Sequence, residues 1–317
     1  MPMRSETELI QLIERLAGPQ NSPGLRVGIG DDAAVLACPG PADELLATTD
    51  QLVENKHFIC DQHPPDALGH KLLVRGLSDI AAMGGTPSWF LLSLALPNRL
   101  NDSWIENFLA GLLAAPNKSG AEPIVLAGGD VSGSELFSAH VTVVGTIPAG
   151  QALLRSGCRP ADAVYVSGRL GGSALGLERL ARASFDDSTT RHLWPTARLA
   201  LGNRLRELGV RTALDISDGL STDLNRLAQA SSVRIRLDFD ALPRFPEATD
   251  SQVLHGGEEY ELLFSAPPSV EIPRSFEGIP LTRIGAATSG SGVVLAREGL
   301  ETVLAPGGFE HLVVGGG

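Results

Sequence analysis

Cysteine is rare in this chain of 317 residues. Cys38, Cys60 and Cys158 are far apart and form no Cys-x-x-Cys pair. The sequence therefore indicates neither a disulfide framework nor a zinc site, and it suits a reducing compartment. The first residues contain no apolar signal-like core, and no apolar run reaches the roughly 20 residues of a membrane-spanning helix. We expect a soluble cytoplasmic protein with no membrane partner.

Positive charge and aromatic residues are also scarce. The chain has 25 Lys and Arg against 37 Asp and Glu, which gives a net charge of −12, and only 5% of its residues are aromatic. This balance argues against nucleic-acid binding, which depends on basic residues that neutralise phosphates. If the protein binds phosphate, metal ions must supply much of the positive charge. The 36 glycines favour a turn-rich α/β or α+β architecture over a helical bundle.

Several well-known catalytic motifs are missing. The chain contains no Gly-x-Ser-x-Gly nucleophile elbow, no Gly-x-x-x-x-Gly-Lys-Ser/Thr phosphate loop and no protein-kinase signature set. No His or Cys stands out as a nucleophile or base. The chemistry must therefore come from another kind of residue.

The length predicts two domains at roughly 150 residues each, and the Pro- and Gly-bounded segment 148–160 predicts the junction between them. We assign residues 1–148 and 149–317 to the two domains. Hydrophobic periodicity predicts helices at 6–17, 66–83, 103–113, 196–208 and 220–230, and one that ends near Ala183. It predicts strands at 45–49, 89–96, 123–127, 139–147, 163–167, 213–216, 233–237, 260–264 and 293–295. Residues 186–190 are expected to form a loop.

What the chain does have is a series of acidic residues beside glycine or hydroxyl residues. They are Gly30-Asp31-Asp32, Thr48-Thr49-Asp50, Leu77-Ser78-Asp79, Gly128-Gly129-Asp130, Asp215-Ile216-Ser217-Asp218-Gly219 and Gly256-Gly257-Glu258-Glu259. So many carboxylates at the ends of strands and helices are costly unless a cation gathers them. Mg²⁺ takes oxygen ligands and is usually shared between carboxylates and substrate phosphates. We therefore predict a cluster of Mg²⁺ ions that holds a polyphosphate.

Each run also has a simpler interpretation. The Asp31-Asp32 run is equally typical of an Asp-rich β-turn, and the hydroxyls of Thr48 and Thr49 suit either metal ligands or ordinary strand residues. Asp79 could form an i,i+4 ion pair with Arg75, but we favour metal ligation because the acidic runs recur. Gly128-Gly129-Asp130 predicts a flexible turn that approaches phosphate oxygens, or a turn whose Asp caps a helix.

The run at 215–219 is the most specific one. Strand alternation places Asp215 and Ser217 on one side, and Asp218 or Ser217 can then cap the helix that begins at Leu220, whose free N–H groups favour an anion. Capping explains one acid but not both. Arg155 is a candidate phosphate clamp, although a single Arg is more often a surface residue. His57 is more often structural than catalytic when it stands alone.

In this order, the runs resemble those of the thiamine-monophosphate kinases. The matching stretches are GIGDDAAVL, TTDQLVENKHF, GLSDIAAMGGTP, LAGGD, RSGCRPAD, LDISDGLSTDL and HGGEEYELLF, which span about residues 28–264. The family belongs to a superfamily of ATP-binding enzymes that includes aminoimidazole ribonucleotide synthetase, selenophosphate synthetase and a hydrogenase maturation factor. The resemblance implies a two-domain α+β fold like that of aminoimidazole ribonucleotide synthetase. An N-terminal mixed sheet with helices would pair in a homodimer, and a C-terminal α/β domain would follow.

The resemblance also implies roles for individual residues. Asp32, Thr48, Thr49, Asp50, Asp79, Asp130, Asp215 and Asp218 would bind several Mg²⁺ ions in a metal- and ATP-binding site. Gly128, Gly129, Asp130, Arg155 and Ser217 would contact ATP, while His57, Glu258 and Phe309 would contact thiamine monophosphate. No residue is assigned a catalytic acid or base role, because the attacking phosphate is already anionic.

The chain departs from the family pattern at three positions. Gly76 stands where the family usually has Asn, Val131 replaces a Thr after Gly-Gly-Asp, and Glu259 replaces an Asp. The expected reaction converts ATP and thiamine monophosphate to ADP and thiamine diphosphate. The nearest enzymatic alternative is aminoimidazole ribonucleotide synthetase. A catalytically silent nucleotide- or Ca²⁺-binding protein is the alternative from another class. The Cys residues typical of selenophosphate synthetase and of the hydrogenase maturation factor are absent.

Overall fold

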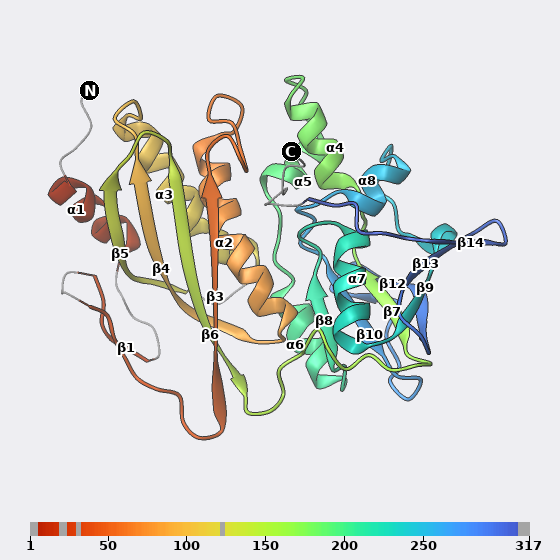
Figure 1. The fold of residues 1–317 in the computed structure, drawn as a ribbon. Coiled ribbons are helices and arrows are strands. Elements are labelled where there is room, and N and C mark those ends of the chain that lie inside the picture. The colour runs from red at the N-terminus through yellow and green to blue at the C-terminus, as the bar shows by residue number, and fades with distance from the viewer. Residues whose placement is uncertain (1–5, 19–23, 30–32, 121–123, 310–317) are drawn as a thin grey trace, which may run out of the picture. The chain divides into compact units, whose positions relative to one another are not determined.

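The structure is a computed structural model that describes residues 6–18, 24–29, 33–120 and 124–309. The chain forms two compact units, Met1–Gln151 and Ala152–Gly317. Each unit is built around its own mixed sheet (Figure 1).

The first unit contains a four-stranded sheet in the order β3-β6-β4-β5. These strands are β3 (Asp43–Val53), β4 (Thr86–Leu96), β5 (Val125–Gly133) and β6 (Ser138–Pro148). β6 is antiparallel to both β3 and β4, whereas β5 is parallel to β4 and forms one edge of the sheet. The sheet is therefore mixed, as predicted for the N-terminal domain.

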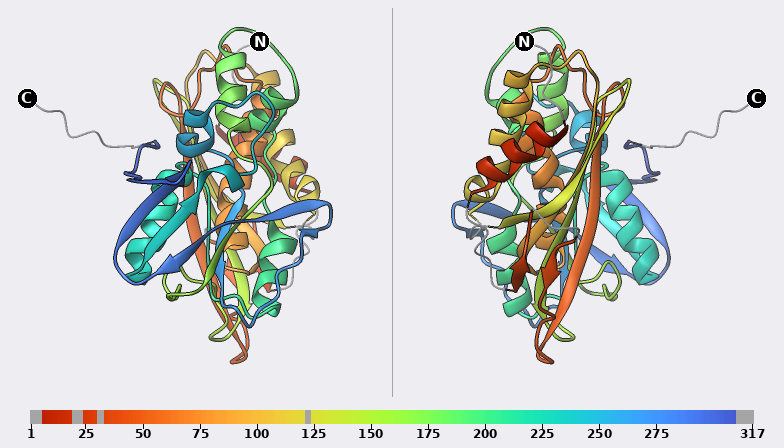
Figure 2. Two further views of the ribbon diagram at one scale, coloured as in Figure 1. Left: turned by 90° about the vertical axis from the view of Figure 1, so that its right-hand side faces the viewer. Right: turned by 90° about the vertical axis from the view of Figure 1, so that its left-hand side faces the viewer.

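Helices cover one face of this sheet. α2 (Pro65–Ala82) packs against α3 (Asp102–Lys118) and contacts β3 and β6, and the edge-on views show both helices on the same side (Figure 2). Val141 and Val143 on β6 are fully buried, whereas the alternating residues His140 and Thr142 are only partly buried. Strand alternation therefore separates an apolar face under the helices from a second face.

The remaining elements of the first unit lie at its N-terminal end. α1 (Glu6–Ala17), at the predicted position, contacts β5 and α3. β1 (Leu25–Val27) and β2 (Val35–Leu36) pair with each other in a two-stranded sheet.

The second unit contains an eight-stranded sheet whose main order is β14-β13-β9-β12-β7-β10-β8, with β11 paired to β12. Its strands are β7 (Ala163–Ser167), β8 (Thr212–Asp215), β9 (Arg234–Asp238), β10 (Leu262–Ala266), β11 (Ser275–Phe276), β12 (Ile279–Thr288), β13 (Gly292–Arg297) and β14 (Leu300–Val303). Among the described strands of this sheet, only β9 and β13 pair in parallel, and the other neighbouring strands are antiparallel. The sequence did not predict β11, β12 or β14.

Five helices and one short 3-10 helix accompany this sheet among the described residues. They are α4 (Gly172–Leu180), α5 (Asp187–Leu193), α6 (Leu199–Glu207), α7 (Leu220–Ser231), α8 (Asp250–His255) and η1 (Phe239–Ala241). The apolar face of α7, with Leu224 and Leu227 fully buried, belongs to one core with Val164, Leu214 and Ile235 from the strands. Burial of this core is the main stabilising contribution that the sequence pattern encodes.

The predicted loop at 186–190 is wrong. Asp186 caps a helix there by accepting hydrogen bonds from the backbone N–H groups of Ser188, at 2.9 Å, and Thr189, at 3.2 Å. Asp, Ser and Thr have low helix propensity, which explains the error, but the same residues favour the N-terminal cap. Tertiary packing completes the helix, since Ser188, Thr189 and His192 are buried.

Candidate functional site

Three predicted metal ligands of the first unit meet under α2. Thr48 and Asp50 lie on the helix-facing side of β3, and the Thr48 hydroxyl donates a hydrogen bond to Asp79 Oδ2 on α2. Arg75, one turn before Asp79, places Nε 3.3 Å from Asp50 Oδ1. Asp79 is partly buried. Segments about 30 residues apart thus contribute to one polar group.

Burial and neighbouring charge act on Asp50 in this group. Burial raises the pKa of Asp50 to about 6, the Arg75 guanidinium opposes that rise and the Asp79 carboxylate adds to it. Two carboxylates close together in a partly buried place favour a cation. The carboxylate and hydroxyl oxygens here are the ligands that Mg²⁺ prefers, so Thr48, Asp50 and Asp79 fit a magnesium ion in donor chemistry. In the part of the chain that the structure describes, however, no three His, Cys, Asp or Glu side chains gather as a metal site.

Asp50 lies inside a strand, which differs from the prediction that a short strand ends just before it. β3 continues to Val53 because its pairing with β6 is unbroken from Asp43 to Val53. The alternation along β3 then places Thr49 on the opposite face from Thr48 and Asp50. The Thr49 hydroxyl donates to the carbonyl of Val141 at 3.1 Å. The structure does not bring the Thr49 side chain to the group formed by Thr48, Asp50 and Asp79.

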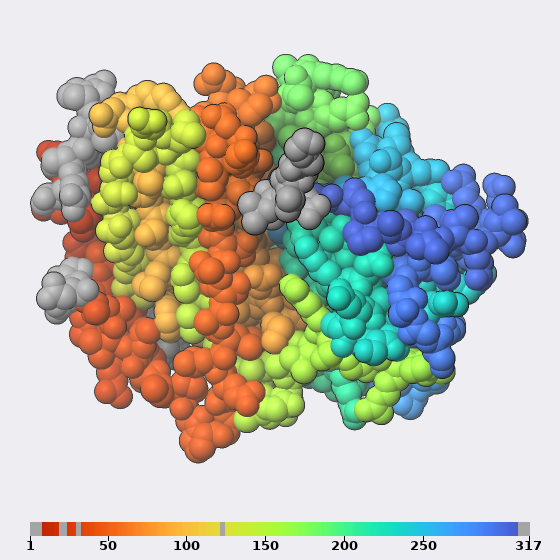
Figure 3. Space-filling view, in the orientation of Figure 1, coloured from red at the N-terminus to blue at the C-terminus, as the bar shows by residue number. Residues whose placement is uncertain are grey.

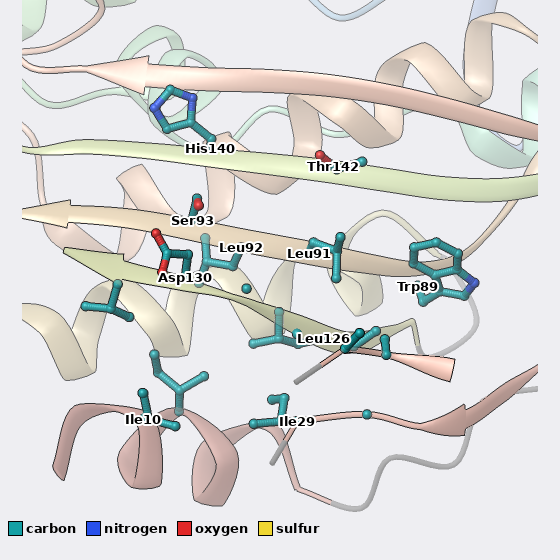
Figure 4. Close-up of a pocket in the computed structure, with 18 of the residues that line it drawn as sticks. Ile10, Ile29, Trp89, Leu91, Leu92, Ser93, Leu126, Asp130, His140 and Thr142 are labelled. Carbon is teal, nitrogen blue, oxygen red and sulfur yellow. The ribbon is translucent and has the colours of Figure 1, made fainter. Parts of the chain in front are cut away.

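Asp130 also lies on the face away from α2. It pairs in register with Ser93, which pairs with His140, and all three line a hollow of about 1210 Å³ (Figure 4). Other lining residues come from α1, from the segment around Ile29 and from Trp89, Leu91 and Thr142. The described metal-ligand candidates of the first unit therefore lie on opposite faces of one sheet. Asp32, the remaining predicted ligand of this unit, lies outside the described residues.

The turn predicted at Gly128-Gly129-Asp130 is wrong, because β5 runs straight through it. Gly128, Gly129 and Asp130 pair with Leu91, Leu92 and Ser93 of β4. A Cβ atom on Gly129 would lie 1.8 Å from the Leu92 carbonyl oxygen. The close approach of the two strands therefore requires glycine at this position. This requirement holds whether or not a phosphate also approaches the backbone here.

In the second unit, the structure joins two predicted sites through the backbone. The chain leaves β8 at Asp215, which is only 5% exposed, and continues beside the segment 257–261. The Glu258 N–H donates to the Ser217 carbonyl at 2.7 Å, and the Ile216 N–H donates to the Glu261 carbonyl at 2.8 Å. Ser217, predicted to contact ATP, thus lies beside Glu258, predicted to contact the second substrate.

The predicted cap by Asp218 or Ser217 is wrong. The N-terminal cap of α7 is Gly219, at φ 109°, and no side chain caps it. The Asp218 carboxylate instead accepts a hydrogen bond from Arg226. Arg226 also donates to Asp223 at 2.7 Å, and the Asp223 carboxylate accepts from the Asp218 backbone N–H at 3.1 Å. Burial raises the pKa of Asp223 to about 6, which Arg226 opposes and Asp218 reinforces.

Phe309 reaches this place from the C-terminal end of the described chain. Its backbone N–H donates to the Asp218 carbonyl at 3.1 Å, and its ring is half exposed. The preceding Gly308 N–H donates to the Thr222 hydroxyl at 3.1 Å. The structure therefore brings together Ser217, Asp218, Glu258 and Phe309.

His57 and Arg155 belong to different units. His57 Nδ1 accepts a hydrogen bond from the Val53 N–H at 3.0 Å, which fixes the turn after β3. The Arg155 side chain is exposed, and its carbonyl accepts from the Ser231 hydroxyl at 3.2 Å. Their roles toward substrates remain predictions.

A buried ion-pair cluster in the second unit was missed by the sequence interpretation. Glu261 is fully buried and accepts hydrogen bonds from Arg198 at 2.5 and 2.8 Å, from Arg191 at 2.8 Å and from the Ser167 hydroxyl at 2.5 Å. Arg191 also contacts Glu259. Burial alone would raise the pKa of Glu261, but Arg198, Arg191 and Ser167 together lower it to about 2. The only signal in the sequence was the pair of acids after Gly257.

No helix among the described residues is long and apolar enough to cross a membrane.

Two family models match the chain. AIR synthase related protein, N-terminal domain, matches residues 30–147, and AIR synthase related protein, C-terminal domain, matches residues 159–305.

Individual relatives cover nearly the whole chain. The thiamine-monophosphate kinase of Salmonella typhimurium is 38% identical over 307 residues, which are 90% of this chain and 92% of that protein. The crystal structure of thiamine-monophosphate kinase from Stenotrophomonas maltophilia K279a matches with a TM-score of 0.78 and 33% identity, covering 93% of this chain and 97% of that one. AaThiL in complex with AMPPCP and TMP matches with a TM-score of 0.76 and 33% identity, covering 98% and 99%. The predicted fold is confirmed, and the chain belongs to the thiamine-monophosphate kinase family.

Proposed function

We propose that this protein transfers the γ-phosphoryl group of ATP to thiamine monophosphate and releases thiamine diphosphate and ADP. The observation that carries the proposal is the full-length match to AaThiL, a relative whose structure holds AMPPCP and TMP. The local geometry agrees with it, because a nucleotide-contact candidate, Ser217, lies beside two candidates for the second substrate, Glu258 and Phe309. The relatives are named thiamine-monophosphate kinases, which supports a role of this activity in thiamine biosynthesis.

The reaction needs positioning more than acid–base chemistry. A phosphate oxygen of thiamine monophosphate is already anionic at neutral pH and attacks the γ-phosphorus in line. Glu258, whose side chain is 22% exposed, offers a carboxylate to the cationic thiamine moiety. The half-exposed ring of Phe309 offers an apolar surface to an aromatic ring.

Magnesium belongs to this proposal. Thr48, Asp50 and Asp79 would hold one ion, and Asp130, Asp215 and Asp218 are the further described side chains that we propose as ligands. When bound, Mg²⁺ supplies positive charge that lets two anionic substrates approach. Arg75 and Arg226 meanwhile hold Asp50 and Asp218 in place through their ion pairs.

We further propose a cytoplasmic homodimer in which the first unit contributes residues that bind ATP and Mg²⁺ and supplies the interface. The face of its sheet opposite α2 carries Leu45, Ala47 and Thr49 of β3, all exposed. In the space-filling view, β3 and β6 lie at the surface of this unit, where no described helix covers them (Figure 3). A second copy of the same sheet is the occupant that the family resemblance implies.

A direct assay tests the proposed function. Purified protein with ATP, Mg²⁺ and thiamine monophosphate should form thiamine diphosphate, which chromatography with fluorescence detection measures. Omission of Mg²⁺ should abolish product formation. A folded protein that forms no thiamine diphosphate but turns over ATP with a purine precursor would move the function to aminoimidazole ribonucleotide synthetase. No ATP turnover at all would identify a silent binding protein.

A further inference from the structure

Two neighbouring residues of α5 contact the two neighbouring acids at 258–259. Arg191 Nε donates to Glu259 Oε2 at 3.1 Å, and His192 Nδ1 lies 3.6 Å from Glu258 Oε2. We propose that Arg191 of α5 and Glu259 form a clamp that holds Glu258 in the orientation required to bind thiamine monophosphate. This inference rests on the proposed function, and it assigns positioning roles to Arg191 and Glu259 that go beyond it.

The backbone around the two acids adopts an unfavourable conformation. Glu258 has φ 59° and Tyr260 has φ 52°, in the left-handed region that residues other than glycine rarely adopt. Hydrogen bonds from the Glu258 N–H to Ser217 and from the Tyr260 N–H to Ile216, at 2.7 and 2.9 Å, keep the segment beside the end of β8. Such a conformation persists only where surrounding contacts determine it, and it is common at ligand sites.

The Glu259 carboxylate supplies further contacts of this kind. It is 1% exposed and is held on both oxygens, by the Ser173 backbone N–H at 3.0 Å and by Arg191 at 3.1 Å. Ser173 lies in the first turn of α4, where the N–H groups and the helix dipole favour an anion. Loss of either partner would leave a buried charge uncompensated, which is costly. The two contacts therefore hold the carboxylate, and with it the backbone of Glu259, in one position.

Arg191 connects this carboxylate to the rest of the sheet. Its Nη2 donates to Glu261 Oε1 and to the Arg169 carbonyl, both at 2.8 Å. One guanidinium therefore holds Glu259 and Glu261, which stand on either side of Tyr260. A planar group with several donors in fixed directions is suited to this, whereas a lysine ammonium is not.

Glycines of α4 make room for the clamp. A Cβ atom on Gly172 would lie 2.5 Å from Arg191 Cδ, and one on Gly176 would lie 2.0 Å from the Ser188 carbonyl oxygen. α5 can approach α4 this closely only because both positions are glycine. The close packing is thus encoded in α4 as well as in α5.

Exposure separates the roles of the two acids. The Glu258 side chain is 22% exposed and can reach a ligand, whereas that of Glu259 is 1% exposed and cannot. Glu258 is therefore the binding group and Glu259 the anchor. His192, buried and 3.0 Å from the Ser173 hydroxyl, lies against the Glu258 carboxylate and limits its side-chain freedom.

Steady-state kinetics of Glu259→Gln tests the clamp. The variant keeps the side-chain size and removes the charge, so we expect the KM for thiamine monophosphate to rise about tenfold, with kcat and the KM for ATP within about twofold. Glu259→Asp keeps the charge and should recover part of the loss. Arg191→Lys should behave like Glu259→Gln because it cannot hold two carboxylates. Arg204→Met, which removes an exposed Arg of α6, is the matched control and should match the wild type.

The outcomes distinguish the clamp from the proposed function. If the wild-type protein makes no thiamine diphosphate, the proposed function fails. If it does, and folded Glu259→Gln keeps the wild-type KM for thiamine monophosphate, the clamp is wrong. Equal rises in both KM values would also contradict it, because they would indicate a general structural defect. Should Glu259→Gln fail to fold, as judged by circular dichroism, Arg191→Lys gives the same readout.

Discussion

Arg75 Nε on α2 lies 3.3 Å from Asp50 Oδ1 on β3. This ion pair links the helix to the strand at the place where the Thr48 hydroxyl bonds to Asp79. One cation thus stands beside two carboxylates that would otherwise repel each other. The arrangement keeps the acids close together before any metal binds, at a cost in stability that depends on pH.

Asp50→Asn should abolish most of the activity and change how stability depends on pH. The folded-state pKa of Asp50, about 6, exceeds the ordinary value of 3.8. Its contribution to the free energy of unfolding is therefore fully present below pH 3.8 and is lost as the pH rises through 6. Asn does not titrate. The stability of Asp50→Asn relative to the wild type should therefore rise by roughly 1–3 kcal/mol between pH 4 and pH 7.

Urea denaturation of the metal-free proteins at several pH values measures this difference. Asp43→Asn, which removes an exposed carboxylate at the start of the same strand, is the matched control. A difference between Asp50→Asn and the wild type that stays constant from pH 4 to pH 7 would contradict the burial of the Asp50 charge.

Hydrophobic periodicity predicted most of the helices and strands that carry the acidic runs, because it is a local property of the sequence. It could not show that Asp50 shares a face of the sheet with Thr48, since a strand that was predicted to end at Thr49 continues to Val53. The ion pair of Arg226 with Asp218 was not predicted either. Asp218 was expected to cap α7, but glycine can also occupy a helix cap, and Gly219 does so here. These features depend on strand pairing and on contacts between distant segments.

The ion-pair cluster around Glu261 was missed for a related reason. Arg198 lies in the predicted helix at 196–208, whereas Arg191 directly follows residues 186–190, which were expected to form a loop. Local propensity argued against a helix there, and only burial against α4 overrides that preference. Conversely, Glu259 was noted only in the last acidic run and as a departure from the family pattern, whereas the structure shows it buried and paired with Arg191.

Gly129→Ala should destabilise the edge of the first sheet. The new methyl group would lie 1.8 Å from a backbone oxygen of Leu92, which cannot move without disturbing the β4–β5 pairing. We expect a loss of about 1–3 kcal/mol in the free energy of unfolding. Gly128→Ala is the matched control, because its Cβ would meet only the Leu91 side chain at 3.5 Å. Thermal unfolding that shifts equally in the two variants would contradict the close approach at Gly129.

Glu261→Gln should destabilise the second unit, most strongly near neutral pH. The folded-state pKa of about 2 lies below the ordinary value of 4.5, so the stabilisation is present above pH 4.5 and is lost as pH falls toward 2. Removal of one partner from a buried ion pair costs about 3–5 kcal/mol. Urea denaturation should show this loss at pH 7 and a smaller one at pH 3.5. A loss that grows as the pH is lowered would contradict the assigned charge of Glu261.

Leu45→Glu should weaken the proposed dimer without unfolding the first unit. Leu45 is 54% exposed on the sheet face that no described helix covers, so a charge there costs little in the monomer. In an interface between two copies, two such charges would be buried near each other, and burial of unpaired charge opposes association. Sedimentation equilibrium should show a dimer for the wild type and a lower mass for the variant.

Val303→Glu, on the exposed edge strand β14 of the second unit, is the control and should keep the wild-type mass. A wild-type protein that sediments as a monomer, or a dimer that tolerates Leu45→Glu but not Val303→Glu, would place the interface elsewhere.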